Sequence, residues 1–141
     1  MAIYSLAQRT TNVTINNACA AWRAAASNRP KVLEVSWISA TATACSIGLG
    51  RPAAIGVTPV NVLFQADDPG EAAAVTNGSL SWGTSPAAPT IYHRRANFAA
   101  TIGVGIVWTF PRGLIIPASG TLVLFNITAS VAADVNCVID E

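Results

Sequence analysis

Hydrophobic and polar side chains follow a period of two over most of the chain. Runs rich in β-branched and aromatic residues lie at 31–38, 43–49, 60–65, 79–82, 90–93, 104–110, 114–116, 121–127 and 135–139. Gly, Pro, Asn and Ser separate these runs. Many short strands punctuated in this way are typical of a β-sandwich or barrel. The pattern predicts an all-β, antiparallel β-sandwich of about eight strands, with residues 1–141 as a single domain.

Four short segments predict turns between these strands. Asn77-Gly78 is a strong hairpin signal, because both residues accept positive φ angles. Three further segments each combine a proline, which fixes φ, with a glycine, which adopts positive φ angles without steric cost: residues 67–70, 111–113 and 117–120.

Little helix is expected. Residues 18–27 are rich in Ala, the best helix former, but the segment is short and a strand remains the alternative. Residues 71–75 would make one helical turn at most.

The chain is poor in charge, which changes the interpretation of its surface. Charged residues make up 11% of it, against about 25% in an average globular protein, and the formal net charge is +1. Such a surface protects a free monomer weakly against association. Lys31 is the only lysine, so the positive charge is almost all arginine, the cation that interfaces favour. We therefore expect the chain to be covered by copies of itself or by a partner.

Nucleic acid and membranes are not expected partners. The isoelectric point of about 7.7 lies below the value of about 9 typical of nucleic-acid-binding domains. Residues 113–133 are uncharged and long enough to span a bilayer, but residues 117–120 break them in the middle. Residues 1–9 carry their first positive charge after the apolar residues, the reverse of a secretory signal. We expect synthesis in the cytoplasm without a signal peptide.

No residue pattern predicts an enzyme. His93 is the only histidine, which excludes metal sites that need two or three, and we interpret it as a surface or interface residue. Asp67, Asp68 and Glu71 cluster on a predicted turn, which we interpret as a solvated loop, because catalytic carboxylate pairs normally face each other across a cleft. We therefore predict no catalytic residue, no cofactor and no metal.

The cysteines carry little information. Cys19, Cys45 and Cys137 are odd in number, show no CxxC spacing and sit among small or apolar neighbours. We interpret them as buried free thiols that act as small hydrophobic residues.

The N-terminal residues are candidate interface residues. Ile3, Tyr4, Leu6 and Arg9 lie in residues 1–12, which could form an arm that reaches a neighbouring subunit. The alternative is that the same residues form the first strand of the sandwich.

Two tryptophans and two arginines complete the candidate interface. Trp22 and Trp82 have small or polar neighbours, so they fit a core, a subunit interface or a surface that stacks on a sugar ring. Arg94 and Arg95 are adjacent and would point to opposite faces of a strand. We expect at least one of them in an ion pair between subunits.

Residues 108–126 resemble a recurring jelly-roll element, in which a Pro-x-Gly turn and a Pro-Ala-x-Gly turn precede a strong apolar strand. Over its whole length the chain, rich in Ala, Thr and Pro and poor in Lys, looks like structural proteins of tailed bacteriophages. It is most similar in size and character to jelly-roll capsid decoration, or cement, proteins. The resemblance implies a homotrimer on the capsid surface of the virion that braces the major capsid protein. It assigns no functional residue.

The resulting functional hypothesis is a non-enzymatic virion protein, a capsid decoration subunit that stabilises the shell through multivalent contacts. One alternative is a carbohydrate- or receptor-binding module of a phage tail or fibre, which would expose Trp22, Trp82 or Tyr92 on one face. A small enzyme would need a pocket that holds His93 with a carboxylate. A tail-tube or connector protein fits the sequence as well as a decoration protein does.

Overall fold

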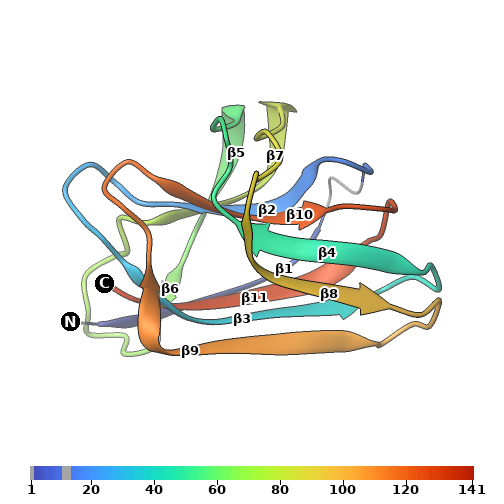
Figure 1. The fold of residues 1–141 in the computed structure, drawn as a ribbon. Helices are drawn as coiled ribbons and strands as arrows, with labels where there is room; N and C mark the ends of the chain where they lie inside the picture. Colours follow the sequence, from blue (N-terminus) through green and yellow to red (C-terminus); the bar gives the residue numbers. More distant parts are fainter. Residues whose placement is uncertain (1, 11–13) are drawn as a thin grey trace.

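The computed structural model describes residues 2–10 and 14–141, which form eleven β-strands and, within these ranges, no helix. The strands are β1 (Ile3–Arg9), β2 (Ala18–Arg23), β3 (Lys31–Ser39), β4 (Cys45–Gly50), β5 (Val57–Leu63), β6 (Gln65–Ala66), β7 (Asn77–Thr84), β8 (Tyr92–Phe98), β9 (Gly105–Ile115), β10 (Thr121–Asn126) and β11 (Ala133–Asp140). They form two antiparallel sheets that face each other (Figure 1). The predicted antiparallel β-sandwich is confirmed. The described part of the chain contains no helix long and apolar enough to cross a lipid bilayer.

The strand order identifies eight of these strands as a jelly roll. Sheet A has the order β6-β1-β11-β3-β9, and sheet B has the order β5-β7-β2-β10-β4-β8. Without β5, β6 and β7, two four-stranded sheets remain, and the chain passes between them as in the paired Greek keys of a jelly roll. The three additional strands all lie in residues 51–91, between β4 and β8, and we call this segment the 51–91 insertion. It explains why the strand count exceeds the expected eight.

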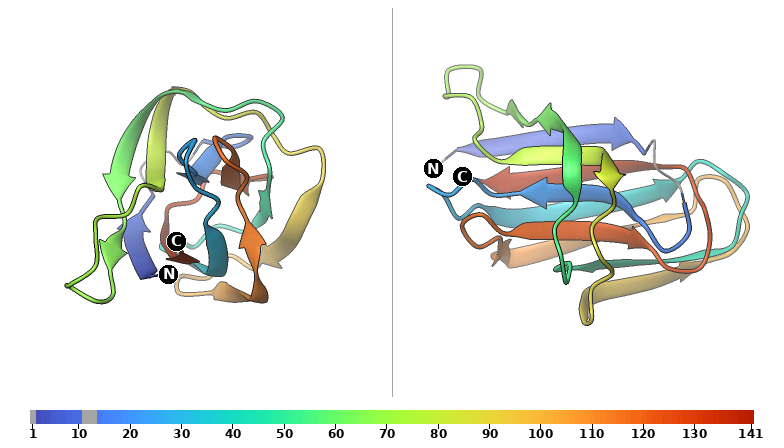
Figure 2. Two further views of the ribbon diagram at one scale, coloured as in Figure 1. Left: turned by 90° about the vertical axis from the view of Figure 1, so that its left-hand side faces the viewer. Right: turned by 90° about the horizontal axis from the view of Figure 1, so that it is seen from above.

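The 51–91 insertion extends both sheets on the same side of the sandwich. In sheet B, β7 pairs with β2, and β5 pairs with β7. In sheet A, β6 pairs with β1. The two ends of the insertion, residues 51–56 and 85–91, cross the outer face of sheet B next to each other, and Ala87 N donates to Ala54 O at 3.0 Å (Figure 2). The middle strands of sheet B, β2 and β10, are therefore covered on both faces.

Two hydrophobic clusters follow from this arrangement. The main core lies between the sheets, where Trp37 of β3 stacks on Phe98 of β8 with ring centres 4.7 Å apart. The second cluster lies between sheet B and the crossing residues. All six residues of β10 are buried, because the main core covers one face of the strand and the crossing residues cover the other. The second cluster consists of Ala18, Ala21, Val123 and Phe125, with Trp82, Tyr92 and Ile127 packed against it.

The strand boundaries decide the predicted helix and two of the predicted turns. The Ala-rich residues from Ala18 to Arg23 form β2, not a helix. Asn77-Gly78 is not a turn but the start of β7, where both residues pair with β2 and β5. The turn at residues 117–120 is confirmed, since Gly120 N donates to Pro117 O at 2.7 Å.

Candidate functional site

A bulge in β9 shapes one lateral edge of the sandwich. The register between β3 and β9 shifts between Val32 and Glu34, where four residues of β9, 110–113, stand opposite one residue of β3. Gly113 in this bulge has a φ angle of 71°, a left-handed conformation that glycine adopts without strain. The predicted turn at 111–113 is therefore a bulge inside a continuous strand. Bulges of this kind redirect side chains.

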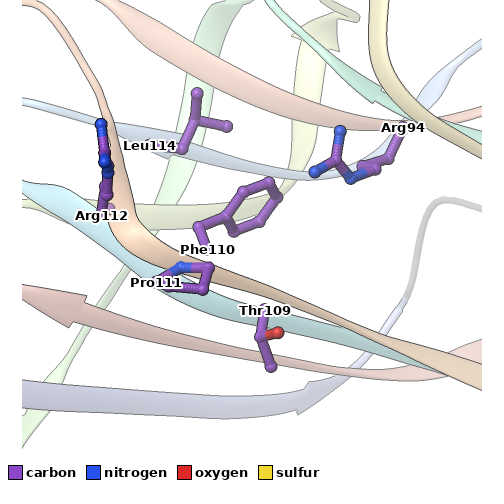
Figure 3. A pocket seen from close by; sticks show the side chains of 7 residues that line it. Arg94, Thr109, Phe110, Pro111, Arg112 and Leu114 are labelled. Carbon is purple, nitrogen blue, oxygen red and sulfur yellow. The ribbon is translucent and has the colours of Figure 1, made fainter.

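A groove of about 380 Å³ lies beside the bulge (Figure 3). The guanidinium carbon of Arg94, on β8, lies 5.4 Å from the centre of the Phe110 ring. At this distance a cation is attracted to the face of an aromatic ring. We call this site the basic groove, and it is lined by Arg94, Thr109, Phe110, Pro111, Arg112, Gly113 and Leu114.

Positive charge gathers around the basic groove. Arg51 Nη2 donates to the carbonyl of Ile115 at 3.0 Å, at the end of β9. Burial lowers the pKa of His93, and the charges of Arg51 and Arg94 lower it further. None of the seven described lining residues carries a carboxylate. The groove therefore favours a binding partner that combines negative charge with apolar surface.

Carboxylates gather on the opposite lateral edge, beside β6 and β1. Asp67, Asp68 and Glu71 line a shallow hollow together with Ile3 and Ala2. The loop is an ordered turn, because Glu71 N donates to Asp68 O at 3.1 Å. The turn predicted at residues 67–70 is thus confirmed. We call Ile3, Asp67, Asp68 and Glu71 the acidic edge.

The described residues offer neither a grouped set of metal ligands nor an exposed thiol. Within residues 2–10 and 14–141, no three His, Cys, Asp or Glu side chains are grouped as metal ligands. Cys19, Cys45 and Cys137 are free and buried, as expected. Burial raises the pKa of Cys19 to about 12 and also raises the pKa of Cys45 and of Cys137. These thiols are protonated near neutral pH and are poor nucleophiles.

The N-terminal candidates lie on a strand. Residues Ile3–Arg9 form β1 and pair with β11 along its whole length, so this segment is the first strand of the sandwich. Residues 1, 11 and 12 of the predicted arm lie outside the described residues. Tyr4 is buried and Leu6 packs against the main core, so both stabilise their own subunit and offer no interface. Ile3 is exposed on the acidic edge, and Arg9 pairs with Asp134.

The remaining candidates divide between core and surface. Trp22 is buried in the main core, so it offers no surface for a subunit contact or a sugar. Trp82 is half-buried and packs against the second cluster. Arg94 and Arg95 are both exposed on β8, and Arg95 lies 5.4 Å from the ring centre of Tyr92. The predicted ion pair between subunits stays a prediction.

The sequence pattern did not point to the exposed apolar residues of β5. Val57, Val60 and Leu63 of β5 are 57%, 62% and 57% exposed. Their strand is at the edge of sheet B, with no neighbour beyond it among the described residues. Alternation along this run predicts one buried face, but Val57, Val60 and Leu63 of β5 are all exposed, although Val60 alternates with the other two. Only the position of the 51–91 insertion at the edge of the sandwich reveals this.

No protein-family model, curated protein or solved structure matches the chain. The resemblance to phage decoration proteins stays a prediction from the sequence features described above.

Proposed function

We propose that this protein is a non-enzymatic structural subunit of a virus particle, which associates with copies of itself and decorates a capsid by binding the major capsid protein. A homotrimer is the form that the resemblance implies. The proposal is supported by the jelly-roll fold, by the small share of charged residues and by the apolar side chains that the fold leaves exposed.

The observation that carries the proposal is the exposed apolar surface of β5. Isolated hydrophobic residues on a surface are normal, whereas several on one edge strand favour an interaction site. Pro59 lies in the same strand and has no N–H group to donate to a further strand. This edge therefore suits packing of side chains against a partner more than extension of the sheet.

The area of the molecule is compatible with a multivalent role. A stable contact buries about 800 Å² on each partner. The accessible surface of the chain is 6707 Å², so two contacts of about 800 Å² per subunit would cover about a quarter of it. Enough surface remains for a third contact, with the capsid.

The test has two arms. Sedimentation velocity of the purified chain over a range of concentrations measures self-association, and a monomer at every concentration would contradict that part of the proposal. A tagged chain expressed in the cell that makes the particles is then followed through a density gradient. We expect it to sediment with DNA-filled particles and to lie on the outside of the shell in electron micrographs. A chain that stays among the light soluble fractions would overturn the capsid role.

A further inference from the structure

We infer that copies of this chain associate head to tail, with the acidic edge of one copy seated on the basic groove of the next. The inference rests on the self-association in the proposed function and adds the surfaces through which it takes place. It is carried by the position, charge and shape of the two surfaces.

The two surfaces lie at opposite lateral edges and at the same level along the strands. The acidic loop is attached to β1, where Asp67 N donates to Ile3 O at 2.9 Å. Ile3 pairs with Asp140, Asp140 with Lys31, and Lys31 with Ile115 at the end of β9. This row of residues crosses sheet A from one edge to the other. Figure 2 shows β6 and the adjoining loop on one side of the sandwich and β8 on the other.

The charges of the two edges cannot neutralise each other within one subunit. Four strand spacings separate β6 from β9 in sheet A, a distance of about 19 Å. The screening length at physiological salt is about 8 Å. Among the described residues the one ion pair within 4 Å is Arg9–Asp134, which belongs to neither edge. A net charge of +1 is therefore compatible with a polar molecule that has the acidic edge on one side and the basic groove on the other.

The apolar components of the edges also match. The basic groove has a half-buried Phe110 and Leu114 between Arg94 and Arg112. The acidic edge has Ile3, 37% exposed, among its carboxylates. An apolar centre with a charged rim is the usual anatomy of a protein interface.

A second copy is the occupant that this complementarity favours, because one chain carries both halves of the contact. A contact between two different patches is heterologous, so it repeats from copy to copy and either closes into a ring or continues as a filament.

Two single charge reversals test the contact. Glu71→Lys makes the acidic edge less negative, and Arg112→Glu introduces negative charge beside the groove; both positions are exposed. Arg23→Glu, on β2, changes the net charge as Arg112→Glu does and serves as the control. Thermal melting of each variant confirms that it folds. Association is then measured by sedimentation velocity for each variant and for an equal mixture of the first two.

The expected result is that each reversal raises the dissociation constant about tenfold or more, while Arg23→Glu matches the wild type. Mixing the two variants restores association as far as heterodimers, because the intact groove of the Glu71→Lys chain meets the intact acidic edge of the Arg112→Glu chain. If the wild type associates but the reversals have no effect, the edge contact is wrong and self-association stands. If the wild type is monomeric, both fail. An acidic partner protein that binds the groove of a monomeric chain would identify a different occupant and also overturn the inference.

Discussion

The side chain of Leu6 occupies the space that a Cβ atom on Gly78 would need. Leu6 belongs to β1 of sheet A, and Gly78 belongs to β7 of sheet B. The contact joins the two sheets at the side where the 51–91 insertion is attached. It also explains why Gly78 is a buried strand residue although its sequence context, Asn-Gly, is typical of a turn.

Replacing Gly78 with alanine should therefore destabilise the protein. A methyl group at this position would force Leu6 or the β7 backbone to move, and we expect the free energy of unfolding to fall by about 2 kcal/mol. Urea denaturation followed by tryptophan fluorescence measures the change. Gly70→Ala is the matched control, because that position is on an exposed turn and its Cβ would have only Asp68 Oδ1 within 3.3 Å. Equal stability of both variants and the wild type would contradict the packing described here.

Trp37 should tolerate phenylalanine better than its complete burial suggests. Its ring stacks on Phe98, but its Nε1–H has no hydrogen-bond partner among the described residues. An unpaired buried donor costs about 1–3 kcal/mol, and Trp37→Phe removes it while keeping an aromatic ring. We expect Trp37→Phe to cost about 1 kcal/mol and Trp37→Ala about 4 kcal/mol in chemical denaturation. Similar losses in the two variants would show that the indole N–H is satisfied.

The three cysteines should be inert in the native protein. Cys19, Cys45 and Cys137 are buried, and burial raises the pKa of all three thiols. A colorimetric thiol reagent at neutral pH should therefore react with none of them before unfolding and with all three in denaturant. Rapid native labelling of any one of them would place that thiol at the surface.

His93 should make stability depend on pH. Because its pKa is lowered in the folded protein, the unfolded chain takes up a proton first as the pH falls below the ordinary value of 6.5. Above pH 6.5 the residue is neutral in both states and has no effect. The melting temperature should therefore fall as the pH falls below 6.5, and the fall should be complete once the pH is below the lowered pKa.

The variant His93→Gln provides the comparison, since it cannot take up a proton at the same site. Its melting temperature should change less than that of the wild type when the pH is lowered from neutral toward the range where carboxylates begin to titrate. Identical pH profiles would show that another group is responsible.

The strands could be predicted from the sequence where local pattern and tertiary environment agree. Residues 121–127 combine β-branched and aromatic residues with a preceding Pro-Ala-x-Gly turn, and β10 is found there as Thr121–Asn126. The sequence pattern failed where a distant contact overrides a local preference. Asn77-Gly78 is part of a strand because it pairs with β2 and β5, and Leu6 leaves no room for a side chain at Gly78. Residues 111–113 are a bulge because β3 continues to pair on both sides of them.

The charged surfaces could not be predicted from the sequence, because they depend on topology. Asp67, Asp68 and Glu71 were recognised as a cluster, and Arg94 as a candidate contact, but sequence separation says nothing about the opposite edges on which they lie. Arg112 gave no signal at all. Its position beside the groove follows from the bulge in β9, at the Pro-Arg-Gly sequence that the chain pattern predicted as a turn between two strands.

The path of the 51–91 insertion over sheet B gives the molecule two unlike broad sides. One side is formed by the strands of sheet A, and the other is covered by the segments of the insertion that cross sheet B. A layer of such subunits in one common orientation would present sheet A on one surface and the crossing segments on the other. The two broad sides are therefore distinguishable, so a flat surface that binds the protein would contact one of them and leave the other in solvent.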